Sequence, residues 1–343
     1  MNMRDITSFD PSALAHALAG ISRARIALVG DICLDAYWTA DMTKSELSRE
    51  TPHFPLPIVS ERYAPGAGGN AACNLAALNP QSLAVVGAIG EDWRGAILRD
   101  ALSARGVPAA HIVTSPSITT NAYIKPMRTG ISGVSYEDAR LDFISRDALP
   151  PAIEDALIAH LDALAPSLDA LVVCDQMPLG AITDRVRARI NRLAADGLTV
   201  VVDSRDGIAR FHHAILKPNE VELARATGLP ADDPLAAARA LANQNAARVL
   251  VTLGESGCAY VDGDACARYG AVRVVGEIDI CGAGDSFLAA FSAAMAGGAP
   301  IDQSIAVATF ASAVTIQKIG QTGTATREEI LAAFERAQME GTL

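Results

Sequence analysis

The sequence has no hydrophobic run approaching the ~20 apolar residues that a membrane-spanning helix requires. Its N-terminus lacks a basic stretch followed by an apolar core and a small-residue cleavage site, and residues 1–22 instead predict a short helix. Half of the 343 residues are nevertheless hydrophobic, which is enough for a large buried core. We therefore expect a cytoplasmic protein that has no membrane partner.

Patterns for disulfide bonds and for histidine-bound metal are also absent. The six cysteines form no C-x-x-C pair and lie mainly in apolar segments, which predicts reduced thiols. The six histidines show no metal-ligand spacing, because His212 and His213 are adjacent and would point in different directions. We expect neither a disulfide framework nor a metal bound by histidine.

Positive charge is scarce, and the formal net charge is −11. A nucleic-acid partner would therefore need a local basic patch that overrides the charge of the whole chain. The one candidate is a group of four arginines between Arg185 and Arg192, interleaved with apolar residues on a predicted helix. We interpret this group as a solvated helix face and expect no nucleic-acid partner.

No G-x-x-x-x-G-K-[ST] phosphate loop occurs in the chain, but residues 276–298 offer another anion site. A glycine-rich loop there leads into a helix with apolar residues on one face. Gly282, Ala283 and Gly284 leave open the backbone N–H groups at the helix start, where the positive end of the helix dipole lies. Asp285 follows, either as a base or simply as a helix cap.

Short apolar segments alternate with helix patterns along most of the chain. These segments are residues 25–30, 82–90, 168–174, 198–203, 214–217 and 248–253. Strands that alternate with helices predict an α/β fold, with a central, mostly parallel sheet that helices cover on both faces. Because no linker or repeat interrupts the pattern, we expect a single domain over residues 1–343.

Two segments break this alternation, residues 37–64 and residues 118–146. Both contain short strand-like pieces without a helical stripe, which predicts a small β-sheet lid over a substrate. An isolated lid sheet would expose its edges and several apolar side chains, namely Tyr37, Trp38, Phe54 and Ile58. We therefore expect a homodimer that forms through the lid.

Residues 279–285, DICGAGD, resemble the D-[TS]-x-G-A-G-D signature of the ribokinase-like, or phosphofructokinase-B (PfkB), carbohydrate kinases. The resemblance implies a ribokinase-like fold and a kinase that uses ATP and Mg²⁺, with a monovalent cation such as K⁺ as a further candidate. It also implies that Asp285 removes the proton of a sugar hydroxyl. The N–H groups of Gly282, Ala283 and Gly284 would then form the anion hole.

Further motifs follow in the order that this family has them. By resemblance, the substrate-binding residues are Asp31, Asp35, Gly66, Gly69 and Asn70. The nucleotide-binding residues are Lys217, Asn219, Thr252, Gly254 and Gly257, and Glu222 would act on Mg²⁺ through water. From the residues alone, Asp31 and Asp35 could equally lie in a turn. Asn219 and Glu222 could equally cap a helix, and the glycines after Thr252 could form a hairpin turn.

Within the family, residues 30–38 and the proline-rich residues 50–59 are most similar to heptose 7-phosphate kinase, the kinase half of a bifunctional protein. This implies that D-glycero-D-manno-heptose 7-phosphate is phosphorylated at its anomeric hydroxyl. Because the chain ends at Leu343, we expect no adenylyltransferase domain to follow. A buried substrate phosphate would need cations. The candidates on the two lid segments are Lys44, Arg49, Lys125, Arg128 and Arg140.

Two alternatives stay open. One is a kinase for another sugar or a nucleoside, such as ribose, fructose or adenosine, which needs no cationic cluster. The other is a catalytically silent protein of the same fold that binds sugars or nucleotides. Ala67, Ile280 and Thr309 favour the second alternative, because each departs from the family pattern at a site position.

Overall fold

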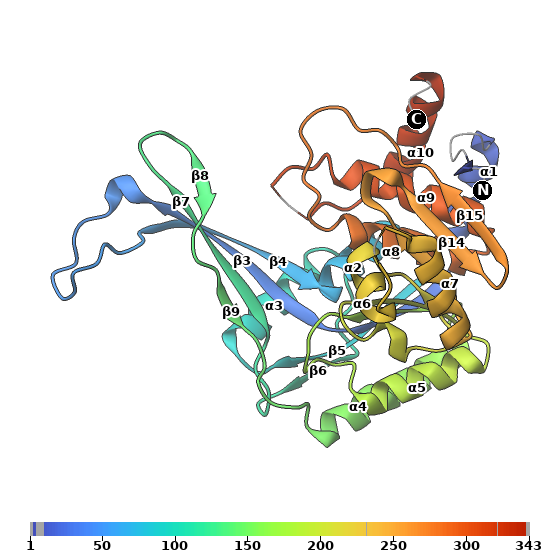
Figure 1. The fold of residues 1–343 in the computed structure, drawn as a ribbon. Coiled ribbons are helices and arrows are strands. Elements are labelled where there is room, and N and C mark those ends of the chain that lie inside the picture. Colours follow the sequence, from blue (N-terminus) through green and yellow to red (C-terminus); the bar gives the residue numbers. More distant parts are fainter. Residues whose placement is uncertain (1–2, 5–9, 231, 321, 341–343) are drawn as a thin grey trace.

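The computed structural model describes residues 3–4, 10–230, 232–320 and 322–340. An α/β body carries a β-sheet arm that projects from one side (Figure 1). Within the described residues, the sheet of the body runs in the order β1-β15-β14-β13-β12-β11-β10-β2-β5-β6. Its strands are β1 (Met3–Arg4), β2 (Arg25–Gly30), β5 (Ser82–Gly90), β6 (Ile112–Ser115), β10 (Ala170–Asp175), β11 (Thr199–Ser204), β12 (Ile215–Leu216), β13 (Arg248–Thr252), β14 (Cys258–Asp262) and β15 (Ala265–Tyr269).

Strands β13 to β6 in this order are all parallel to one another, which confirms the mostly parallel sheet. Every predicted strand is present, with ends shifted by two residues or fewer. The antiparallel strands β14 and β15 were not predicted. Apolar and polar residues alternate only weakly in these two segments, so the pattern that predicts a half-buried strand is weak there.

Helices cover both faces of the sheet (Figure 1). One face is packed by α1 (Pro11–Ile21), α2 (Gly68–Ala77), α3 (Trp93–Ser103), α8 (Ala283–Ala296), α9 (Ile301–Thr315) and α10 (Arg327–Glu340). The other is packed by α4 (Pro151–Leu164), α5 (Asp184–Ala195), α6 (Glu220–Thr227) and α7 (Pro234–Asn245). Helix α1 confirms the N-terminal helix over residues 11–21, but residues 3–4 form strand β1 instead, and residues 1–2 and 5–9 of that prediction lie outside the described ranges. Burial on both sides explains why the central strands are continuously apolar.

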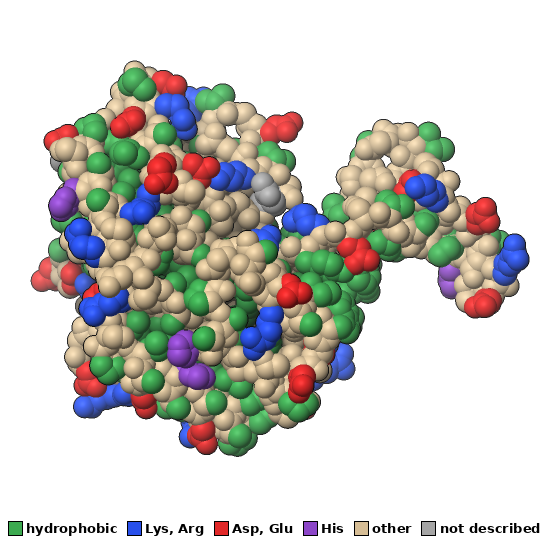
Figure 2. Space-filling model, turned by 180° about the vertical axis from the view of Figure 1, so that it is seen from behind, with side chains coloured by type: hydrophobic (Ala, Val, Ile, Leu, Met, Phe, Trp, Pro, Cys, Tyr) green, Lys and Arg blue, Asp and Glu red, His purple; other side chains and the backbone are tan. Residues whose placement is uncertain are grey.

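The arm is the predicted lid, and it stands clear of the body (Figure 2). Its strands are β3 (Ile32–Asp41), β4 (Ile58–Ala67), β7 (Ala122–Thr129), β8 (Ser135–Glu137) and β9 (Leu141–Phe143). The first lid segment is longer than the predicted 37–64, because β3 begins one residue after β2 ends and β4 continues into α2. Phe54 and Ile58 are exposed, but Tyr37 and Trp38 are only half-exposed.

Other predictions have mixed outcomes. Four cysteines are buried as expected, whereas Cys281 is exposed. The prediction that the arginines between Arg185 and Arg192 form a solvated face is wrong for Arg187. This residue is buried and ion-paired with Asp184 and Asp175. Among the helices in the described ranges, none is long and apolar enough to cross a membrane.

Candidate active site

The predicted base lies in the first turn of α8, at the edge of the sheet where the parallel strands end. Asn70, on α2, donates a hydrogen bond from Nδ2 to Asp285 Oδ2 at 2.6 Å. Asn70 is buried, so the amide holds the carboxylate in a fixed orientation. The structure therefore brings together two side chains that the sequence assigned to the base and to the substrate site.

The start of α8 requires glycine at position 282. Gly282 has a φ of 81°, in the left-handed region, and a Cβ atom there would lie 2.6 Å from Asn70 Nδ2. A side chain would therefore displace the amide that orients Asp285. The N–H group of Ala283 donates to Ile280 O at 3.1 Å, so it is turned into the loop. In a helix, the N–H groups of the next residues have no carbonyl of a preceding turn as partner, and the anion hole at Gly284 stays a prediction.

A buried ion pair lies beside this helix start. Lys217 Nζ is 2.9 Å from Asp203 Oδ2, and the ammonium is 3.9 Å from where a Cβ of Gly284 would be. Burial alone would lower the pKa of Lys217, but the carboxylates of Asp203, Glu222 and Asp285 together more than offset this effect, so the pKa is raised. Lys217 therefore stays charged, next to the predicted anion hole. Asp203 was missed as a site residue, although it ends a predicted strand just as the acids near Gly30 do.

The surroundings of Asp285 favour the protonated, neutral form of its carboxyl group. Burial raises its pKa to about 6, and the nearby Asp203 and Asp35 carboxylates act in the same direction. The hydrogen bond from Asn70 and the charge of Lys217 oppose this rise. A base whose pKa lies close to the working pH transfers protons efficiently, so this environment suits general-base catalysis.

The lid supplies the second carboxylate of the cluster. Asp35 lies on β3, and its Oδ2 is 3.2 Å from Lys125 Nζ on β7, which also donates to Tyr37 Oη at 3.1 Å. Burial alone would lower the pKa of Lys125, but Asp35 and Tyr37 more than offset this and raise it. A Cβ at Gly66 would lie 2.8 Å from Asp35 Oδ1, so the glycine makes room for the carboxylate. Asp35 lies near enough to Asp285 for its charge to raise the pKa of that carboxyl, and its predicted role in holding sugar hydroxyls stays a prediction.

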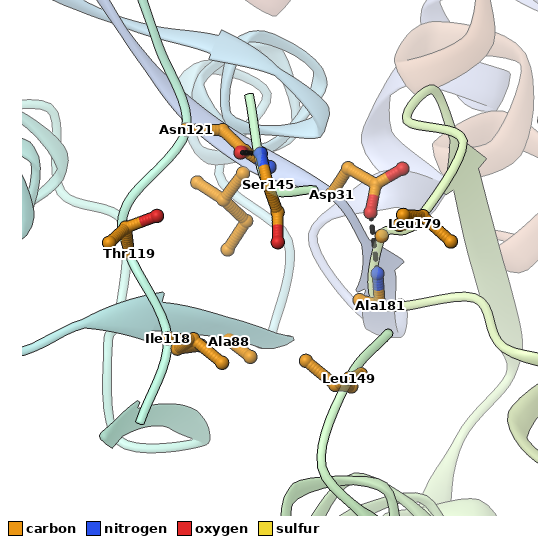
Figure 3. Close-up of a pocket in the computed structure, with 11 residues that line it drawn as sticks. Asp31, Ala88, Ile118, Thr119, Asn121, Ser145, Leu149, Leu179 and Ala181 are labelled. Atoms are coloured by element: carbon orange, nitrogen blue, oxygen red, sulfur yellow. Dashed lines mark hydrogen bonds between the residues drawn. The ribbon is translucent and has the colours of Figure 1, made fainter. Parts of the chain in front are cut away.

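Asp31 has a different environment from the one predicted. Its carboxylate is buried and accepts three backbone N–H groups, from Gln176, Met177 and Ala181, each at 2.7 Å. Burial raises the pKa of Asp31 to about 6, against the effect of these hydrogen bonds. A cavity of about 30 Å³ lies beside it, room for about one water molecule (Figure 3). Asp31 therefore anchors the 176–181 loop, and this cavity is too small for a sugar.

Gly69 and Ala67 both lie where β4 meets α2, next to the predicted substrate residues. A Cβ at Gly69 would lie 2.8 Å from Pro65 Cβ, so this glycine permits close packing of α2 against β4. Ala67, where the family has glycine, adopts φ 50° and ψ −132°. Side chains rarely tolerate this conformation, so the departure is accommodated as backbone strain.

The nucleotide motifs come together at the ends of β12 and β13. Asn219 and Glu222 form a reciprocal capping box on α6, each side chain accepting the other residue's N–H at 2.9 Å. Asn219 also bridges to Thr252, and the residues 254–257 turn from β13 into antiparallel β14. Gly257 has φ 84°, and a Cβ there would meet Tyr269 O at 2.0 Å. The cap and the hairpin turn are thus the local structures, and nucleotide binding stays a prediction.

No group of three or more His, Cys, Asp or Glu side chains that could hold a metal occurs among the described residues. Burial raises the pKa of Glu222, the one predicted metal residue. Such a site fits Mg²⁺ only through water and through the phosphates of a nucleotide, which is how this ion is commonly bound.

The family model for pfkB family carbohydrate kinases matches residues 24–327. A curated relative, the bifunctional protein HldE of Azorhizobium caulinodans, is 33% identical over 332 residues, which cover 93% of this chain and 66% of the relative. The HldE protein of Gluconacetobacter diazotrophicus is 34% identical over 322 residues, 91% of this chain and 64% of the relative. The chain thus spans about two thirds of the length of these relatives.

Solved structures show the same fold. Arabidopsis thaliana ribokinase complexed with ribose and ATP has a TM-score of 0.68 at 20% identity, and the match covers 91% of this chain and 99% of the ribokinase. Phosphofructokinase-2 from Escherichia coli in complex with potassium has a TM-score of 0.72 at 21% identity, with the same coverage. The predicted base, Asp285, lies at the glycine-containing start of α8, near the lid residue Asp35, in a ribokinase-like fold. The chain therefore belongs to the pfkB family of carbohydrate kinases, phosphotransferases that act on sugars.

Proposed function

We propose that the protein transfers the γ-phosphoryl group of ATP to a hydroxyl of a phosphorylated sugar, with D-glycero-D-manno-heptose 7-phosphate as the first candidate and its anomeric hydroxyl as the acceptor. The observation that carries this proposal is the cluster of Asp285, Asp35 and Lys125, where a base, a hydroxyl acceptor and a cation meet. The HldE relatives favour a heptose phosphate.

The chemistry follows from the cluster. Asp285 takes the proton from the acceptor hydroxyl as its oxygen attacks the γ-phosphorus. The new O–P bond forms while the bond from the γ-phosphorus to the β-phosphate oxygen breaks, and ADP leaves. The start of α8, with Gly284, and the ammonium of Lys217 stabilise the negative charge on the transferring group. Asp35 and Asn70 hold the sugar hydroxyls.

ATP binding is assigned to the loop ends that carry Asn219, Thr252, Gly254 and Gly257. Mg²⁺ neutralises charge on the nucleotide phosphates when it is bound, and Glu222 would hold it through water. A monovalent cation remains part of the proposal, supported by the potassium complex of the phosphofructokinase-2 neighbour. Measuring turnover in K⁺ against tetramethylammonium salts tests the cation directly.

Two cations of the lid lie on the face that carries Asp35, which favours a phosphorylated acceptor. Side chains alternate between the two faces of a strand, so the lid cations are divided between these faces. Lys125 lies on the face of the lid that carries Asp35, and Arg140 reaches the same face by stacking on Tyr123, 4.7 Å from the ring centroid. Arg128, three residues after Lys125 on β7, lies on the opposite face and pairs with Asp138.

The other two candidate cations lie away from the cluster. Lys44 is exposed and pairs with Asp41, and Arg49 is exposed on the loop between β3 and β4. Of the five cations that the sequence offered, we therefore assign only Lys125 and Arg140 to the substrate site.

One observation favours the alternative of an unphosphorylated sugar. Lys125 is already paired with Asp35, and Arg140 with Asp142, so these pairs reduce the net positive charge at the cluster. Comparing kcat/KM for heptose 7-phosphate, fructose 6-phosphate, ribose, fructose and adenosine at equal concentration distinguishes the two. A free sugar that reacts as well as its phosphate would overturn the phosphorylated substrate. Binding without ADP release across the panel would instead favour the silent binding protein.

We also propose that the lid mediates a homodimer. Exposed apolar residues gather on it, namely Phe54, Ile58, Ile131, Val134, Tyr136, Leu141 and Phe143. An unpaired sheet with this much exposed apolar surface is normally covered. Sedimentation velocity at micromolar concentration tests the proposal. A monomer with normal activity would rule out an obligatory dimer.

A further inference from the structure

One arginine of the lid touches the catalytic half of the molecule. Arg62, on β4, lies opposite Tyr37 in the antiparallel register, and its guanidinium carbon is 3.8 Å from the centroid of the Tyr37 ring. Its Nη2 donates a hydrogen bond to the carbonyl of Gly320 at 3.0 Å, across 258 positions of the chain. No local sequence pattern predicts this contact, because it depends on the register of the lid strands.

Gly320 is in turn tied to the loop before α8. Its N–H group donates to Asp279 Oδ2 at 3.1 Å, and Asp279 Oδ1 accepts the N–H of Cys281 at 3.0 Å. The backbone N–H of Asp279 donates to Ile316 O at 2.8 Å. A continuous series of hydrogen bonds thus leads from Arg62 to the residue just before Gly282, where the helix of Asp285 begins.

Arg62 also lies on the substrate side of the lid. Tyr37 and Asp35 are two residues apart on β3, so their side chains share one face, and Arg62 joins that face through its pairing with Tyr37. Lys125 donates to the Tyr37 hydroxyl on the same face. Arg62 and Lys125 thus flank one tyrosine next to the carboxylate that holds the sugar.

Arg62 has more unused hydrogen-bonding capacity than its neighbours. Lys125 and Arg140 are each paired with a carboxylate, whereas within the described ranges Arg62 has no carboxylate partner, and its bond to Gly320 engages only Nη2. The guanidinium fork can therefore bind a phosphate with its remaining N–H groups while it holds Gly320. An arginine suits this double contact better than a lysine, whose ammonium acts as a point charge.

We propose that Arg62 is the specificity-determining residue for the phosphate already present on the acceptor, and that its contact with Gly320 couples phosphate binding to the position of the α8 start. This inference rests on the proposed function, since it requires a phosphorylated acceptor. A bound phosphate fixes Arg62, and Arg62 then fixes Gly320, Asp279 and the loop before Gly282. The phosphate thereby increases kcat as well as lowering KM.

The experiment uses the full chain and compares Arg62→Ala, Arg62→Lys and the control Arg128→Ala, a lid arginine on the opposite face. For each protein, kcat and KM are measured for a sugar phosphate and for the corresponding free sugar. The assay with the free sugar is then repeated with added phosphite dianion, which can occupy the site of the phosphate group that the free sugar lacks. Circular dichroism confirms that the variants are folded.

In the native protein we expect phosphite to accelerate turnover of the free sugar. Arg62→Ala should lower kcat/KM for the sugar phosphate by about 10-fold to 100-fold, the usual effect of losing a charge-assisted hydrogen bond. It should change the free sugar little and abolish activation by phosphite. Compared with Arg62→Ala, the Arg62→Lys variant should recover more of the native KM than of the native kcat. The control Arg128→Ala should behave like the native protein.

Two results would overturn the inference while leaving the proposed function intact. One is an equal loss of kcat on free and phosphorylated sugars in Arg62→Ala, which would mean that Arg62 only supports the fold. The other is an unchanged preference for the phosphorylated sugar in that variant. If the native protein fails to phosphorylate every sugar phosphate, the proposed function itself fails.

Discussion

Asn70 Nδ2 and Asp285 Oδ2 lie 2.6 Å apart, although 215 positions separate the two residues in the chain. The contact joins the first turns of α2, which follows directly on β4, and α8, which follows a glycine-rich loop. It links the residue that would hold the sugar to the residue that would deprotonate it, so binding and proton transfer share one hydrogen bond.

Replacing the base tests the mechanism most directly. Asp285→Asn keeps the shape of the side chain and an oxygen that Asn70 can donate to, but it cannot accept a proton. We expect kcat to fall by about 10²-fold to 10⁴-fold, the usual contribution of a general base. ATP affinity, measured by calorimetry, should be nearly unchanged. Asp264→Asn, at an exposed turn, is the matched control, and activity near the native level in Asp285→Asn would refute the assignment.

The rate should depend on pH through Asp285. Burial raises the pKa of this group to about 6, and only the deprotonated form can act as the base. We therefore expect kcat/KM to be constant above about pH 7 and to fall as the pH drops through 6. Because the Asn70 hydrogen bond lowers the pKa of Asp285, Asn70→Ala should move this acid limb to higher pH. A profile that does not move in the variant would argue against Asp285 as the titrating group.

The buried ion pair of Lys217 and Asp203 contributes to stability and activity in different ways. Lys217→Met leaves the Asp203 carboxylate buried without its partner, so we expect a loss of about 3–5 kcal/mol in the free energy of unfolding. Removing both charges in Lys217→Met/Asp203→Asn should recover most of this stability. The double variant should stay inactive, because the cation beside the α8 start is missing. Urea denaturation and steady-state assays of the three proteins check the two effects.

A stabilising change is available at Ala67. This alanine adopts φ 50° and ψ −132°, which costs an alanine more than a glycine. Ala67→Gly should therefore raise the free energy of unfolding by about 1 kcal/mol, measured by urea denaturation. Ala76→Gly, inside α2, is the control and should destabilise the protein by a similar amount. A destabilised Ala67→Gly protein would show that the strain is compensated locally.

The sequence predicted the parts of the fold that depend on local patterns. The parallel strands are apolar throughout, and Gly282 precedes a helix with a clear apolar face, so both were recognised from their neighbours alone. The resemblance of residues 279–285 to a known signature added the role of Asp285. These features need no knowledge of how distant segments meet.

The remaining site residues depend on tertiary contacts that no local pattern contains. Asp203 became part of the site only through its ion pair with Lys217 from the next strand. Arg62 and Arg128 look alike in the sequence, yet the register of β4 and β7 puts them on opposite faces of the lid. Asp31 looked like a ligand residue, but the three N–H groups that it accepts come from a loop about 145 positions away.

The junction between β2 and β3 limits how this protein can be re-engineered. A single residue, Asp31, separates β2 from the first lid strand, and β4 leads directly into α2, which carries Asn70. The first lid segment, β3 and β4, therefore joins the body without a spacer at either end. Exchanging this segment for that of another kinase would have to preserve the backbone from Gly30 to Ile32 and from Gly66 to Asn70, since Asp31 binds the 176–181 loop and Asn70 binds Asp285.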